Sequence, residues 1–169
     1  MCVSFVTHGG NGEGRSSYPG DFDTDKPLIA EVAPDSLDFP APPNPANLRE
    51  IYVSAEATNT YFIDQATLTL GLDNVVRYVV VAQTSGGLRN VSFEGIRCEN
   101  RAWRLYAIGR PDGSWVKPRM SEWRPIDNKT VNRYHAALTR DIFCPNGGVI
   151  RTTEEGQHAL QRGKHRDAN

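Results

Sequence analysis

The sequence has 169 residues, of which 38% are hydrophobic and 23% charged, values typical of one globular domain with a packed core. Its formal net charge of −1 argues against nucleic-acid binding, since domains with that function are usually clearly basic. No apolar run approaches the roughly 18 residues of a membrane span, so we expect no transmembrane segment.

The charges are unevenly distributed along the chain. Residues 1–50 contain eight acidic and three basic side chains, whereas the remainder contains 12 acidic and 16 basic ones. This asymmetry predicts an acidic leader in front of a mildly basic domain, whose charge either binds an anionic partner or solvates the surface.

The first 48 residues are rich in glycine and proline and contain few apolar side chains. We expect residues 1–48 to form a flexible acidic leader. Residues 38–43 are expected to run extended along the domain, because proline fixes φ and removes backbone donors. Phe39 is a candidate anchor for this segment.

The N-terminal residues do not resemble an export signal. They have no basic n-region, and their apolar stretch is shorter than the roughly 7 to 15 residues of a secretory signal. A start codon placed too late, or a removed leader, would produce the same sequence. Cys2 lacks the upstream apolar residues that lipid attachment would need.

From residue 49 onward the sequence predicts strands separated by polar turns. β-Branched and aromatic runs with period-two alternation occur at 51–53, 60–63, 66–70, 75–82, 90–98, 102–108 and 114–116. The most apolar segment, 75–82, is the expected central strand. Alternation places Val91 and Phe93 on one face, and places Ala107 on the same face as Trp103.

Helices are expected only near the C-terminus. Four apolar residues spaced by three or four predict a helix from about 132 to 143 that covers a sheet face; they are Val131, Tyr134, Leu138 and Ile142. The spacing of Thr152 and Glu155 fits a capping box at the start of a second short helix.

These patterns predict an α+β fold. We expect an antiparallel β-meander of about five to seven strands, covered by one or two C-terminal helices. The predicted limits are a leader at 1–48, a single domain at 49–163 and a frayed polar tail at 164–169.

Several sequence blocks together resemble the CNP-one-like family of uncharacterised bacterial proteins, over roughly residues 49–163. The blocks are Asn90–Cys98, Trp103–Gly109, Asp112–Trp115, Glu122–Ile126 and His135–Pro145. The resemblance implies an exported protein of the Gram-negative envelope, often with a signal or lipoprotein leader. It implies no catalytic or ligand-binding residues, and the chain departs from the pattern at its start, where no export leader is present.

The cysteines suggest a compartment. Cys98 ends a predicted strand and Cys144 ends a predicted helix, so a disulfide between them would attach the helix to the sheet. Such a bond fits the oxidising periplasm and would be unusual in the cytosol. The alternative is a pair of buried free thiols in a cytoplasmic protein.

No catalytic or metal-binding motif is recognisable. The four histidines, His8, His135, His158 and His165, are not clustered at ligand spacings, so we expect no metal and no cofactor. An enzyme of unknown reaction would have to use His135, Arg140 and Asp141, with a hydroxyl such as that of Ser92. On one helix His135 and Asp141 lie nearly opposite each other and could not pair.

The most suggestive surface is basic and aromatic. It consists of Arg104, Tyr106, Arg110, Trp115, Lys117, Arg119, Trp123 and Arg124. Arginine and tryptophan side by side suit recognition of sugars, phosphates or an acidic peptide through stacking and forked hydrogen bonds. The alternative is that the tryptophans pack the core while the arginines solvate its rim.

The leading hypothesis is therefore a non-enzymatic accessory or binding domain of the cell envelope, periplasmic or tethered at a membrane face. Its partner would be an envelope protein, a glycan or an anionic ligand. The enzyme described above is the alternative.

Overall fold

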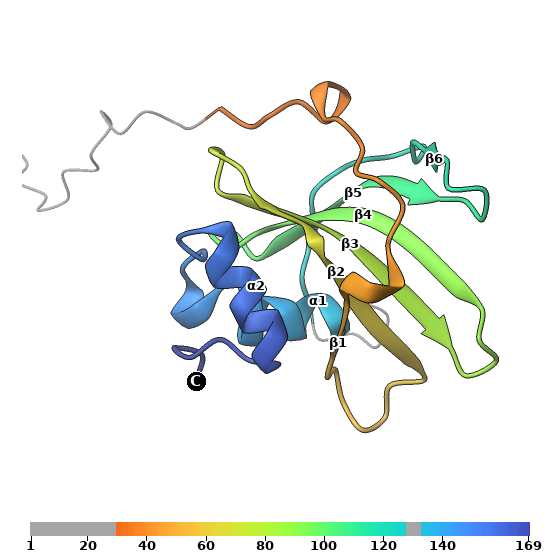
Figure 1. The fold of residues 1–169 in the computed structure, drawn as a ribbon. Helices are drawn as coiled ribbons and strands as arrows, with labels where there is room; N and C mark the ends of the chain where they lie inside the picture. Colours follow the sequence, from red (N-terminus) through yellow and green to blue (C-terminus); the bar gives the residue numbers. More distant parts are fainter. Residues whose placement is uncertain (1–29, 128–132) are drawn as a thin grey trace, which may run out of the picture.

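The computed structural model describes residues 30–127 and 133–169. Cys2 and Val131 lie outside the described residues, as does most of the predicted leader. The fold is α+β, with an antiparallel sheet and two α-helices after it (Figure 1).

The described residues form a seven-stranded sheet. The strands are β1 Leu48–Ile51, β2 Asn59–Leu70, β3 Val75–Thr84, β4 Arg89–Arg97, β5 Ala102–Gly109, β6 Trp115–Val116 and β7 Arg124–Pro125. Their order is β1-β2-β3-β4-β5-β6, each strand antiparallel to the next, with β7 also paired to β5. The predicted meander is confirmed.

The α-helices follow the last strand, as expected, but two single-turn 3-10 helices, Pro34–Ser36 and Pro45–Asn47, precede β1. α1 Arg133–Ala137 continues directly into a π-helical segment, Leu138–Phe143, and α2 Thr153–Arg162 comes last. The Thr152 hydroxyl accepts from the Glu155 amide at 3.2 Å, and the Glu155 carboxylate accepts from the Arg151 amide at 2.6 Å. The capping interaction predicted for α2 is therefore present, with Glu155 reaching one residue further back than expected. No helix in the described part of the chain is long and apolar enough to cross a membrane.

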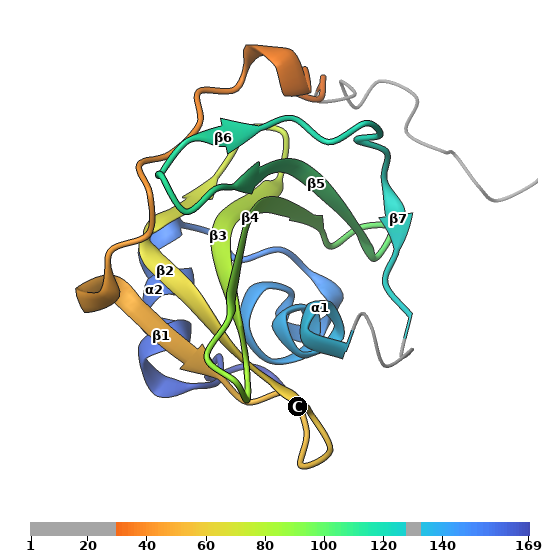
Figure 2. The ribbon, with the colours of Figure 1, turned by 90° about the vertical axis from the view of Figure 1, so that its right-hand side faces the viewer.

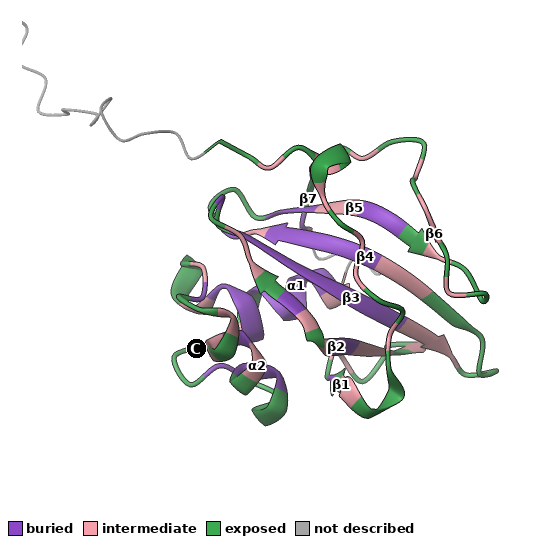
Figure 3. Cartoon of the chain, turned by 45° about the horizontal axis from the view of Figure 1, so that its top comes forward, coloured by how far each residue is buried: buried purple, intermediate pink, exposed green. Residues whose placement is uncertain are grey.

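Both faces of the sheet are buried, but by different means (Figure 2). On one face, α1, the π-helical segment and α2 cover the main core, which includes Tyr78, Ile96, Leu138 and Phe143. The opposite face carries a smaller apolar cluster of Val79, Phe93, Tyr106 and Ala107. β3 lies between these layers, and its residues 75–81 are all buried (Figure 3).

The smaller cluster is covered by an N-terminal segment, residues 31–44, which we call the strap. Its Leu37 and Phe39 pack against the cluster, and the Phe39 ring lies 6.4 Å from the Phe93 ring and 6.3 Å from the Trp115 ring. Phe39 therefore anchors the segment that we expected to lie along the domain. The domain limits stay a prediction.

One expected strand face is wrong. In the pairing of β4 with β5, Phe93 lies opposite Ala107 and Glu94 opposite Leu105. Tyr106 is the extra residue of a β-bulge, which shifts the alternation by one position. Ala107 therefore faces the strap with Phe93, and not the helical side with Trp103.

Cys98 and Cys144 form a disulfide, as one of the two alternatives predicted. Cys98 directly follows β4 and Cys144 directly follows the π-helical segment. The bond therefore attaches the helical layer to the middle of the sheet across a sequence separation of 46 residues.

Replacing both Cys98 and Cys144 by serine should lower the free energy of unfolding by about 4 kcal/mol, because the bond restricts the unfolded chain. Urea unfolding of the oxidised protein and the double variant measures this, with Cys2 replaced by serine in both to prevent thiol exchange. Equal unfolding midpoints would contradict the prediction.

Candidate functional site

The predicted basic and aromatic surface contains one convergent site. The Arg97, Arg104 and Trp123 side chains bind the Glu31 carboxylate together, and we call these three residues the carboxylate clasp. Glu31 Oε1 accepts from Arg104 Nη1 at 2.6 Å and from Trp123 Nε1 at 2.9 Å. Glu31 Oε2 accepts from Arg97 Nη2 at 2.8 Å. Both carboxylate oxygens are thus bound by the clasp.

Strand pairing brings the clasp together. Gly95 lies opposite Arg104, and Arg97 lies opposite Ala102, so the two arginines are diagonal neighbours on the strap face of the sheet. Trp123 comes from the loop before β7, which returns to pair with β5.

Contacts other than those with Glu31 also hold the side chains of the clasp. The Arg97 guanidinium lies over the Trp123 ring, 4.2 Å from its centroid. Arg104 Nε donates to the Ser121 hydroxyl at 3.1 Å, and that hydroxyl donates to the Leu105 carbonyl at 2.7 Å. Stacking and this second hydrogen bond fix the two guanidinium groups, so less side-chain entropy is lost when an anion binds.

The charges favour an ionised carboxylate in this position. Partial burial raises the pKa of Glu31, but hydrogen bonds from Arg97 and Trp123 and the charges of Arg97 and Arg104 outweigh it. The pKa of Glu31 therefore lies below its usual value, and the clasp acts as an anion site at neutral pH.

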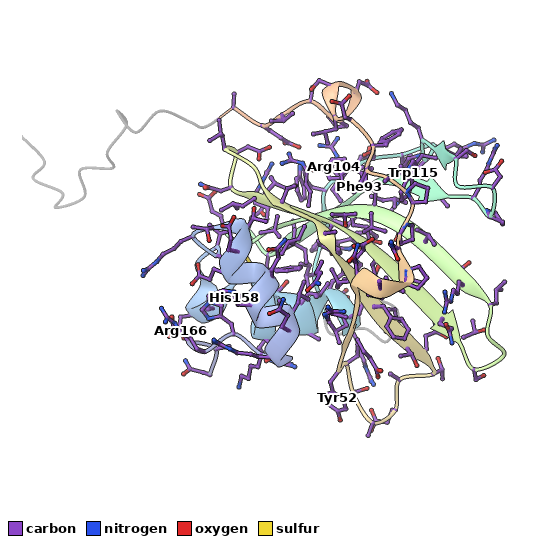
Figure 4. The ribbon with its side chains drawn as sticks, in the orientation of Figure 1. Tyr52, Phe93, Arg104, Trp115, His158 and Arg166 are labelled. Atoms are coloured by element: carbon purple, nitrogen blue, oxygen red, sulfur yellow. A yellow bond between two sulfur atoms is a disulfide. The ribbon has the colours of Figure 1, made fainter. Side chains whose placement is uncertain are left out.

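The other predicted surface residues occupy different environments (Figure 4). Tyr106 is buried, and Trp115 packs beside Phe93 under the strap. Exposed basic residues lie around this region, namely Arg110, Lys117, Arg119 and Arg124. Lys117 pairs with Asp35 of the strap at 2.6 Å. Trp103 packs in the main core, and the Arg124 guanidinium lies 5.5 Å from its ring centroid.

Sequence reasoning missed two members of this site. Arg97 alternates onto the same face as Gly95 and Phe93, and the hairpin register alone would have placed it near Arg104. Glu31 gave no comparable signal, because it lies in an irregular segment far from the strands that it contacts.

The residues of the enzyme alternative do not assemble into one centre. His135 is buried and its Nε2 lies 2.8 Å from Glu94 Oε2. Arg140 and Asp141 instead pair with each other at 2.6 Å. Within residues 30–127 and 133–169, no hydrogen bond or ion pair joins His135 to either of them.

Glu94 is the centre of a buried polar network that binds α1 to the sheet. Its Oε1 accepts from Ser92 at 2.6 Å and Tyr134 at 2.9 Å, and its Oε2 accepts from His135 and, at 3.3 Å, from Tyr78. Burial raises the pKa of Glu94, but the charge of His135 and the hydrogen bonds outweigh it and lower the pKa. Glu94 is therefore an ionised acceptor.

This order of groups differs from that of a hydrolase. In a serine–histidine–acid centre the histidine lies between the hydroxyl and the carboxylate. Here the Glu94 carboxylate lies between Ser92 and His135, so it takes the hydroxyl hydrogen bond that the histidine would need. The network is suited to joining the helix to the sheet.

A second cluster lies at the C-terminal end. Glu155, His165 and Asp167 bring one ligand-type atom each to within 4.8 Å of one another. However, His165 Nδ1 accepts from the Asp167 amide at 3.0 Å, and Nε2 then donates to Glu155 Oε1 at 2.9 Å. An imidazole in this tautomer has no free lone pair for a metal. The neighbouring groove, of about 360 Å³, is also lined by His158 and Arg166 (Figure 4).

Comparisons with known proteins agree with the family resemblance found in the sequence. Residues 31–161 match the sequence model of the CNP1-like family, so the match includes the strap. The chain is 29% identical over 117 residues to "Cryptic neisserial protein 1" of Neisseria gonorrhoeae (strain ATCC 700825 / FA 1090). The alignment covers 62% of this chain and 55% of that protein, so it spans about half of the relative's length. No solved structure matches.

Replacing Glu94 by alanine should lower the free energy of unfolding by about 3 kcal/mol or more, because four donors, of which Tyr78 and His135 are buried, lose their acceptor. Urea unfolding measures the change. Glu99→Ala removes an exposed carboxylate next to the same strand and should change stability by less than about 0.5 kcal/mol. Similar losses in the two variants would contradict the prediction.

The contact of Glu31 with the clasp should be lost in acid. Because the pKa of Glu31 is lowered by the clasp, the contact is complete above the ordinary value of 4.5 and is lost as the pH falls through the lower bound-state pKa. The NMR shift of the Trp123 indole N–H reports this below pH 4.5. The same titration of Glu31→Gln should be flat in that range, and an unchanged titration in this variant would contradict the assignment.

Proposed function

The chain belongs to the CNP1-like family, and we propose that it is a binding domain of the cell envelope whose carboxylate clasp receives an anionic group of its partner. The observation that carries the proposal is the convergence of Arg97, Arg104 and Trp123 on a single carboxylate. Two guanidinium groups and an indole N–H directed at one planar anion match the forked geometry by which arginine binds carboxylates and phosphates.

The chemistry of the clasp favours binding over catalysis. Guanidinium and indole groups donate hydrogen bonds and do not exchange protons near neutral pH. The His135 side chain is buried and its Nε2 contacts Glu94. The clasp therefore has the groups that hold an anion, whereas His135 and Glu94 join α1 to the sheet.

The disulfide supports a periplasmic location. A bond such as that between Cys98 and Cys144 persists in oxidising compartments and is rare in the cytosol of mesophiles. Together with the envelope location implied by the family resemblance, this favours the periplasm. The partner is then an envelope protein, a glycan or another anionic ligand.

Removing the two arginines of the clasp should weaken anion binding. We expect Arg97→Ala/Arg104→Ala to bind a polyanion at least about tenfold more weakly, since each arginine makes a charge-assisted hydrogen bond in the site. Tryptophan fluorescence measures binding of dextran sulfate, poly-L-glutamate and a single-stranded oligonucleotide at several salt concentrations.

The matched control is Arg162→Ala/Arg166→Ala, which removes two exposed arginines near the C-terminus. Equal losses in the two double variants would contradict a specific site. Salt-sensitive binding of the oligonucleotide alone would favour a nucleic-acid-binding protein instead.

The compartment is tested by the intact mass of the protein from fractionated native cells, before and after reduction and alkylation. We expect a periplasmic or membrane-attached protein with one disulfide. A cytosolic protein with reduced Cys98 and Cys144 would contradict the envelope location.

A further inference from the structure

We infer that the partner's anionic group belongs to an acidic protein segment, which binds where the charged half of the chain's own strap, around Glu31 and Asp35, now lies. The inference rests on the proposed function and names its ligand class. In this reading the strap is an internal competitor, and Glu31 occupies the clasp in the place of a partner carboxylate.

The first support is that the surface binds the backbone of the strap as well as its carboxylate. The Val32 amide donates to Asp73 Oδ2 at 3.0 Å, and Trp115 Nε1 donates to the Pro40 carbonyl at 2.8 Å. A free phosphate could occupy the clasp but has no N–H group to donate to Asp73, whereas a polypeptide has one at nearly every residue. The Val32 contact therefore favours a peptide as the partner, while the Pro40 contact holds the part of the strap that contains Phe39.

The amide-binding carboxylate is held in place independently of the strap. Asp73 is buried and forms an ion pair with Arg77, which is also buried. Burial raises the pKa of Asp73, but the hydrogen bonds from Arg77 and Val32 and the charge of Arg77 outweigh it and lower the pKa. Asp73 is therefore a preformed acceptor next to the clasp.

The second support is the spacing of the contacts. Glu31 lies in the clasp, Asp35 pairs with Lys117, and Phe39 packs against Phe93. Glu31 and Asp35 are four residues apart, so the charged part of the surface accepts a segment with two acids at this spacing, next to the Phe39 contact that the strap retains. The partners of these side chains differ in kind, so the surface can bind a segment in one chain direction only.

The third support is that the two halves of the strap are bound by different kinds of contact, charged for Glu31 and Asp35 and apolar for Leu37 and Phe39. Leu37 and Phe39 are packed against the apolar cluster. The contacts of Glu31 and Asp35 are charged, and the Glu31 side chain keeps 29% of its exposure. A partner can replace the charged half while the apolar half stays in place, because exposed ion pairs contribute little net stability.

The test uses full-length protein and a capped pentapeptide with the sequence of residues 30–34. Glu31→Gln removes the internal carboxylate but keeps the length of the side chain. The peptide should then shift the Trp123 indole N–H resonance saturably, with an apparent affinity at least about tenfold higher than for the wild type, since a tethered competitor acts at millimolar effective concentration.

Three controls define the result. Asp38→Asn removes an exposed strap carboxylate and should behave as the wild type. Adding Arg104→Ala to Glu31→Gln should abolish the gain. A peptide with glutamine in place of glutamate should not bind either protein.

The outcomes separate the two proposals. If Glu31→Gln binds inorganic phosphate or dextran sulfate at the Trp123 indole but not the peptide, the peptide inference is overturned and the anion-binding function stands. If no anion shifts that resonance in Glu31→Gln, both are overturned. Equal peptide affinity in wild type and variant would overturn the role of the strap as a competitor.

Discussion

The constraint on which this structure depends is that its sheet has two apolar faces, of which the α-helices among residues 30–127 and 133–169 cover one. β3 is buried through residues 75–81, so both sides of it must be shielded from water. The helices shield one side. The strap shields the other with Leu37 and Phe39, and an irregular segment is thereby given a structural role that its composition alone would not suggest.

The helical layer is held by covalent and polar contacts in addition to packing. The disulfide joins it to the sheet at Cys98, and the Glu94 network joins it at His135 and Tyr134. The buried Glu94 carboxylate can stay ionised because each of its two oxygens accepts two hydrogen bonds. These features explain why the residues that looked most like catalytic groups serve as links between layers.

The sequence was informative where the physics is local. Alternation and turn residues predicted β3 to β6 in order, and Thr152 with Glu155 predicted the start of α2. The runs 60–63 and 66–70, expected as two strands, form the single strand β2, and β7 was not predicted. The face of Ala107 was wrong because a β-bulge depends on how two strands pair, which alternation within one strand does not report. The clasp could be predicted only in part: Arg104 and Trp123 lie in the basic and aromatic run, whereas Glu31 reaches them across more than 70 residues.

The strap both covers the apolar face of the sheet and fills the clasp. The sequence of each half of the strap is constrained by one of these roles. Its apolar half must remain, because the face beneath it would otherwise be exposed. Its charged half makes contacts that contribute little to stability in water, and such contacts are conveniently exchanged for those of a partner. A surface built in this way stays covered when no partner is present, since an exposed face of Phe93 and Trp115 would favour aggregation. In the proposed binding mode, the contacts that keep the clasp filled with Glu31 are the ones that a partner segment has to outcompete.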